Sequence, residues 1–130
     1  MIARNALPLM LMFGAAAGSA ATLPLRPGRF VLVGATCRDP ALAAMFTYDG
    51  RQFSYPHATQ CKSVVRSHRE GAYRVVETCS ALGDGSPAKP TTTETSYRVR
   101  SATHVRVSHS PADAGAAYRW CPSPASMGKL

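Results

Sequence analysis

The sequence predicts a mainly β protein, either a small antiparallel β-barrel or a sandwich of about seven or eight short strands, cross-linked by two disulfides. Three observations predict this class. Apolar and polar residues alternate along several short segments, turn residues recur between them, and four cysteines occur in a chain of 130 residues. A chain of this length is expected to form one domain.

The N-terminal segment has the pattern of an export signal. Arg4 gives a positive start, and Ala6–Ala17 is an apolar stretch that is too short to span a bilayer. Small residues follow, so we expect cleavage after Ala20 or Ala21. A retained N-terminal membrane anchor is the alternative.

The predicted domain organisation follows from this segment. We expect a cleavable signal peptide over residues 1–21, a single β domain over residues 22–121 and a flexible C-terminal tail over residues 122–130. The protein is therefore expected to be exported, either periplasmic or secreted, with no transmembrane span after signal removal.

Export changes the meaning of the cysteines, because an oxidising compartment favours disulfides in small domains. No CxxC motif is present, so zinc is a weaker interpretation. If His68–Gly71 forms a turn, residues whose numbers sum to 140 face each other, which places Cys61 opposite Cys79 at disulfide distance. Four cysteines allow three connectivities, and the sequence alone does not exclude the other two. The hairpin favours Cys61–Cys79, which leaves Cys37 and Cys121 to join the first and last strands.

The first half of the mature chain contains a strand, a helical turn and a hairpin. Phe30–Ala35 is a short apolar run typical of a strand, and Ala41–Met45 is long enough for one helical turn. Asp49–Gly50 is a strong hairpin signal. A two-residue loop there would place Phe46 opposite Phe53 and create an aromatic core face.

The middle of the chain continues with strands. Pro56 cannot donate to a β-ladder, so a strand is expected to resume at Gln60–Arg66. The cysteine hairpin then runs to about Leu82. Gly83–Thr91 is rich in glycine and proline and is predicted to be a loop.

A further hairpin is predicted after this loop, and a last strand is expected at Ala117–Cys121. A pairing in which residue numbers sum to 204, with the loop Ser101–Thr103, keeps Tyr97 and the valines on one face. The outer face then collects four basic side chains, with Arg98 opposite Arg106 and Arg100 opposite His104. Like charges that face each other are unfavourable unless water, nearby Glu94 or a bound anion relieves them.

The sequence contains none of the common catalytic or cofactor-binding motifs, and we predict no catalytic residue, no metal site and no cofactor. A ribonuclease-like site would need two histidines beside a cation. His104 and His109 are five residues apart and fall on opposite sides of a strand. Such a site would therefore depend on the fold bringing in His57 or His68.

The charge balance is the clearest functional indication. Fifteen basic residues, twelve of them arginine, stand against seven acidic residues, and arginine suits carboxylate and phosphate recognition. We predict that Arg98, Arg100, His104 and Arg106 form a partner-binding face for an acidic protein or an anionic envelope component. Nucleic acid is not expected, because Tyr97 points away from the arginines. The alternative is an ordinary solvated face.

The chain broadly resembles small exported β-barrel proteins of bacterial envelopes that contain cysteines, some of which inhibit proteases or lysozymes, although it carries no motif of a named inhibitor family. The predicted function is therefore a non-catalytic binding or inhibitory module. The alternative is a small hydrolase, for example ribonuclease-like, whose histidines are brought together by the fold. The oligomeric state does not follow from the sequence.

Overall fold

The computed structural model describes residues 23–122, which form one antiparallel sheet of eight strands. The strands are β1 (Gly28–Leu32), β2 (Met45–Tyr48), β3 (Phe53–Ser54), β4 (Ala58–Arg69), β5 (Ala72–Leu82), β6 (Pro87–Ser101), β7 (His104–Ser108) and β8 (Ala116–Cys121). A short 3₁₀ turn, η1 (Leu42–Ala44), precedes β2. In this part of the chain no helix has the length and apolar character needed to cross a bilayer.

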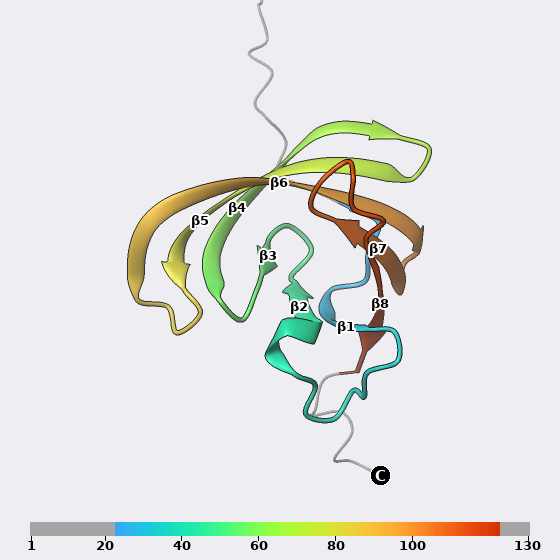
Figure 1. Ribbon diagram of the computed structural model, residues 1–130, viewed down its shortest axis with the longest axis horizontal. Coiled ribbons are helices and arrows are strands. Elements are labelled where there is room, and N and C mark those ends of the chain that lie inside the picture. Colours follow the sequence, from blue (N-terminus) through green and yellow to red (C-terminus); the bar gives the residue numbers. More distant parts are fainter. Residues whose placement is uncertain (1–22, 123–130) are drawn as a thin grey trace, which may run out of the picture.

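The sheet curls into a nearly closed barrel. Its strand order is β3-β2-β1-β8-β7-β6-β5-β4, and the two outermost strands meet at the bridge between Tyr55 and Ala58. The long strands β4, β5 and β6 curve around one side of the molecule (Figure 1). The β4–β5 turn and the β5–β6 turn lie at opposite ends of these strands.

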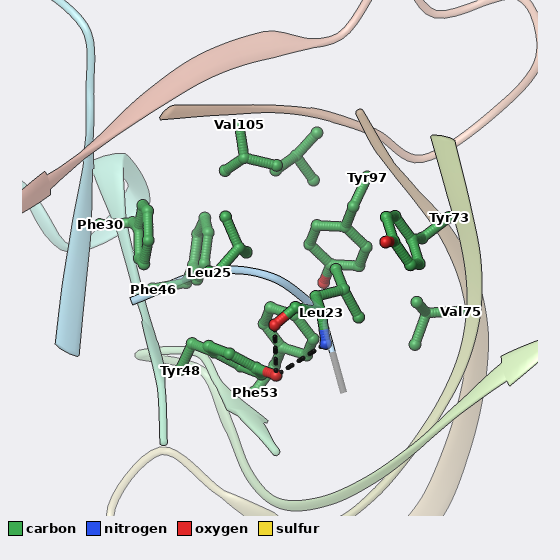
Figure 2. Packing of buried hydrophobic residues seen from close by; sticks show 11 residues of the cluster. Leu23, Leu25, Phe30, Phe46, Tyr48, Phe53, Tyr73, Val75, Tyr97 and Val105 are labelled. Carbon is green, nitrogen blue, oxygen red and sulfur yellow. Dashed lines mark hydrogen bonds between the residues drawn. The ribbon is translucent and has the colours of Figure 1, made fainter. Parts of the chain in front are cut away.

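Aromatic and aliphatic side chains fill the interior of the barrel. Phe53 stacks on Tyr97 with ring centroids 4.5 Å apart, and this contact joins β3 to β6 across the interior. The segment before β1 also enters the core, where Leu23 and Leu25 are buried among these rings (Figure 2). The Tyr48 hydroxyl accepts a hydrogen bond of 2.9 Å from the Leu23 amide, which fixes this segment inside the barrel.

The structure confirms both predicted disulfides and two predicted registers. Cys61 bonds to Cys79, and Cys37 bonds to Cys121. The pairs of β4 and β5 sum to 140 from Cys61–Cys79 to Val65–Val75; a bulge then shifts the register, so that Glu70 and Gly71 alone form the turn instead of the predicted His68–Gly71. The pairs of β6 and β7 sum to 204 from Ser96–Ser108 to Val99–Val105. Alternating polarity therefore fixed these registers, because a one-residue slip would turn the apolar side chains outward.

The predicted register of the β2–β3 hairpin is wrong, because the two central residues of the turn lie one residue later in the sequence than predicted. The central turn residues are Gly50 and Arg51, because the Asp49 carboxylate accepts hydrogen bonds from the amides of Arg51 and Gln52, at 2.8 and 2.6 Å. Gly50 takes the positive φ, +102°, that this turn needs. Phe53 consequently pairs with Tyr48 instead of Phe46. The shift moves each partner by two residues, so both phenylalanines still face the core.

Two predicted element boundaries also need correction. The first strand ends at Leu32 instead of continuing to Ala35, because the chain turns there and the Ala35 amide donates to the Leu32 carbonyl. The predicted loop Gly83–Thr91 is only a turn at its beginning, since β6 already starts at Pro87. Proline is tolerated at the first residue of a strand because no ladder donor is lost there.

A bulge changes the predicted partner of Arg100. The β6–β7 register shifts between Val99 and Ser101, so Ser101 pairs with His104 and Arg100 has no residue directly opposite. The predicted pairing of Arg100 with His104 is therefore wrong, while Arg98 does face Arg106. The predicted signal peptide and nearly all of the predicted tail lie outside the described residues.

The inner disulfide is expected to contribute strongly to stability. Cys61 and Cys79 are 18 residues apart, and a bridge closing a loop of this size contributes about 3 kcal/mol in the chain-entropy treatment. The double variant Cys61→Ala, Cys79→Ala should therefore lose about that much unfolding free energy in urea titrations of the oxidised protein. A variant with an unchanged midpoint and slope would contradict this role.

Candidate functional site

Residues of the barrel strands and of their connections line a cavity of about 740 Å³. Its lining residues come from η1 and β2, the β3–β4 connection, the end of β5, the first part of β6, the end of β7 with the residue after it, and β8. The walls are mainly apolar, with Phe46, Val107 and Tyr118 among the side chains that enclose it. Small-molecule sites in proteins are typically apolar hollows of about 300 to 1,000 Å³, and this cavity lies within that range.

A buried acid lies in the wall of this cavity. Glu77 is only 2% exposed, and both of its carboxyl oxygens are bonded to phenols. The Tyr55 hydroxyl lies 2.7 Å from one oxygen, the Tyr97 hydroxyl contacts the other, and the two hydroxyls lie 2.5 Å apart. The three side chains form a closed ring of three hydrogen-bonding contacts, which we call the acid–phenol ring.

Proton counting assigns the ionisation state of the acid–phenol ring. Three contacts between oxygen atoms need three protons, and the hydroxyls of Tyr55 and Tyr97 supply two. A neutral Glu77 supplies the third proton when its carboxyl group donates to one phenol and that phenol donates to the other, so the ring geometry favours the neutral acid. With an ionised Glu77, one contact would bring two oxygens together without a proton between them.

The surroundings of Glu77 agree with a neutral acid. Burial raises the pKa of Glu77 above its ordinary value, although the hydrogen bonds from Tyr97 and Tyr55 and the nearby His109 oppose this shift. Both ion pairs among residues 23–122 use Glu94 instead of Glu77. Burial likewise raises the pKa of Tyr97 and of Tyr55, so both phenols remain protonated.

Strand alternation places Glu77 inside the barrel. Val75, Glu77 and Cys79 follow each other at every second position of β5, and all three face inward. Sequence reasoning missed this acid, although the register that pairs Cys61 with Cys79 also places Glu77 on the core face opposite Ser63. The available signal was the position of Glu77 between Val75 and Cys79, two residues that the same alternation places on the inward face.

The structure brings two of the four histidines to the cavity. His57 and His109 both line it, and both side chains are exposed at its edge. His68 instead stacks on Tyr73, with ring centroids 3.9 Å apart. His104 lies outside the barrel, where its Nδ1 contacts the Thr103 hydroxyl at 3.0 Å.

The predicted basic face lies on the outside of β6 and β7. Arg98 and Arg106 are direct cross-strand partners, and His104 lies two residues before Arg106 on the same outer side. Arg100 is exposed at the bulge near them. These four residues, Arg98, Arg100, His104 and Arg106, are the basic face, and none of them belongs to an ion pair within residues 23–122.

Glu94 does not relieve the repulsion on the basic face. Its carboxylate lies 2.9 Å from Arg74 on β5 and 3.9 Å from Arg66 on β4. The Arg106 guanidinium donates hydrogen bonds to the carbonyls of Ala114 and Gly115, at 3.3 and 3.2 Å, but keeps its charge. Arg98 and Arg100 are exposed, and neither forms an ion pair with an acidic side chain of residues 23–122.

Within the described part of the chain, no group of three or more His, Cys, Asp or Glu side chains is arranged to hold a metal ion. Comparisons with protein-family models, curated proteins and solved structures find no match to this chain. The geometry therefore defines two candidate sites, an apolar cavity with a neutral acid in its wall and a basic outer face.

The neutral acid predicts a particular pH dependence of stability. The folded protein keeps a proton on Glu77 that the unfolded chain releases above about pH 4.3. The unfolding free energy of wild type relative to Glu77→Gln should therefore fall as the pH rises from about 4 to the pKa of Glu77 in the folded protein. The slope should be about 1.4 kcal/mol for each pH unit within that interval. Urea unfolding between about pH 4 and pH 8 measures this difference.

A matched variant tests the origin of this trend. Tyr73→Phe removes a buried phenol hydroxyl outside the acid–phenol ring, so its stability relative to wild type should not follow the same pH dependence. A wild-type advantage over Glu77→Gln that grows with rising pH would show an ionised, stabilising Glu77 and contradict the proton count.

Proposed function

We propose that the protein is an exported, non-catalytic binding or inhibitory module whose basic face docks an acidic partner. The observation that carries this proposal is the group Arg98, Arg100, His104 and Arg106 on adjacent outer positions, without a carboxylate partner in residues 23–122. An acidic protein or an anionic envelope component would supply the missing negative charge.

The energetics of the basic face favour a bound anion. Arg98 and Arg106 face each other across the ladder, and like charges at such positions repel. Arginine presents several N–H donors in a planar fork that matches carboxylate and phosphate groups. An anion that bridges the two guanidinium groups would relieve their repulsion and form charge-assisted hydrogen bonds.

Two features support export. Both disulfides lie in a domain of about 100 residues, and such bonds persist in oxidising compartments. The pattern of residues 1–21 provides the corresponding signal. We therefore place the partner in the periplasm or outside the cell.

Removing charge from the basic face should weaken binding. Polyglutamate and vesicles containing anionic phospholipid are suitable defined probes for the two partner classes. The double variant Arg98→Ala, Arg106→Ala should bind the preferred probe several-fold more weakly, and wild-type affinity should fall with added salt because exposed charges are screened. Calorimetry or vesicle sedimentation at two salt concentrations measures both effects.

The double variant Lys62→Ala, Arg66→Ala is a matched control. It removes the same charge from exposed positions on β4, two strands away from β6. Equal weakening in both double variants would indicate attraction to net charge alone. Unchanged binding in Arg98→Ala, Arg106→Ala would identify the face as an ordinary solvated surface. Both results would contradict docking at this site.

A small hydrolase is the second candidate, because His57, His109 and Glu77 line one cavity. No hydrogen bond joins these three side chains within residues 23–122, so we rank this candidate below binding. The expected result of a turnover screen with RNA, peptides, esters and glycans is no activity. Turnover that disappears in His57→Ala or His109→Ala, but persists in His68→Ala, would favour the hydrolase.

A further inference from the structure

The entrance of the cavity is apolar. Leu42 in η1 and Leu82 at the end of β5 both line the cavity, and they are 69% and 50% exposed. Only two other large apolar side chains among residues 23–122, Val33 and Val64, are comparably exposed. Leucine side chains at the mouth of an apolar cavity would be covered by a ligand that enters between them.

The cavity wall carries no uncompensated charge in its buried part. Glu77 is neutral in the acid–phenol ring, and both phenol hydroxyls are bonded within that ring. An apolar chain can therefore lie against this wall without leaving a charge or a new polar group unpaired. Affinity in the interior would come from the burial of apolar surface.

Charge selection can occur only near the entrance. Lys89, at the start of β6, lines the cavity and is exposed. His57 and His109 also line the cavity and are exposed. Glu94 also lines the cavity, but its carboxylate lies 2.9 Å from the exposed Arg74 and is thereby compensated. Lys89 is consequently the uncompensated permanent charge among the lining residues.

We propose that this cavity binds a single-chain amphiphile with an anionic head group. The apolar chain occupies the interior beside Phe46 and Tyr118, and the head group remains at the entrance near Lys89. This inference concerns a second site and does not depend on partner binding at the basic face. The shared chemistry is an alkyl chain with a carboxylate or phosphate head, whether from a free fatty acid or from a lipid fragment.

A series of soluble alkyl probes tests both parts of the ligand. In calorimetry with the full domain, affinity for octanoate, decanoate and dodecanoate should rise about three- to fourfold per added methylene, as expected for complete burial. Dodecanoate should bind more tightly than dodecanol, and dodecylamine should bind most weakly. Dodecyl phosphate should match or exceed dodecanoate if a lipid fragment is the source.

Three outcomes would overturn the proposal. Absence of saturable dodecanoate binding up to about 1 mM, a free energy weaker than about −4 kcal/mol, would remove the site. Affinity independent of chain length would show that the chain is not buried. Equal or tighter binding of the alcohol or the amine would refute the anionic head group.

Variants locate the ligand within the cavity. Thr93 is exposed, lines the cavity and pairs with Glu77 across the ladder, so Thr93→Trp should fill the space and abolish binding of every probe. Lys89→Ala should weaken dodecanoate binding about two- to fivefold and leave dodecanol binding unchanged. The matched control Lys62→Ala, on the outer face of β4, should change neither.

The two proposals can fail separately. Arg98→Ala, Arg106→Ala should leave dodecanoate binding at the wild-type level, and Thr93→Trp should leave polyanion binding unchanged. Retained dodecanoate binding in a correctly folded Thr93→Trp variant, checked by its urea midpoint, would place the ligand elsewhere and overturn the cavity assignment. Loss of dodecanoate binding in the arginine variant would assign it to the basic face and also refute the cavity.

Discussion

The stacking of Phe53 on Tyr97 is the contact that joins the core of the barrel to the acid–phenol ring. It joins β3 to β6 across the interior and so holds the two outer parts of the sheet around one core. The Tyr97 hydroxyl reaches Glu77 and Tyr55, so the same side chain forms part of the apolar core and of the acid–phenol ring. A shift of Tyr97 would therefore disturb the core and the protonation of Glu77 together.

The barrel separates two chemical environments that alternate along the same strands. On β6, the odd-numbered Thr95 and Tyr97 face inward, while the even-numbered Arg98 faces solvent. Charge accumulates outside because burial of an unpaired charge is very unfavourable, and the one acid inside is neutral. The basic character of the protein is consequently a property of its outer surface. The interior of the cavity is uncharged, and charged side chains occur only at its entrance.

Sequence patterns predicted the elements whose registers depend on polarity alone. The registers at Cys61–Cys79 and Arg98–Arg106 are as expected, because an odd shift there would expose the valines, and both registers change only at a bulge near the turn. The predicted β2–β3 register was wrong because a side-chain interaction determines the position of the turn. The Asp49 carboxylate accepts hydrogen bonds from two backbone amides, which places the turn one residue later than predicted. The extent of β6 was also missed, because pairing with β5 overrides the loop-like composition of its first residues.

The sequence by itself determined the mainly β class and the outward placement of Arg98 and Arg106 and favoured the observed disulfide pairing, because a period of two residues assigns every side chain of a paired strand to one face. It did not determine which inward residues meet across the barrel. Tyr55, Glu77 and Tyr97 lie on three different segments, separated by up to 42 residues, and only closure of the sheet brings their oxygens together. The tertiary structure alone therefore decided that this acid is neutral, that it lies in the wall of a cavity, and that His57 and His109 are at the cavity edge, because desolvation and proton sharing depend on neighbours distant in sequence.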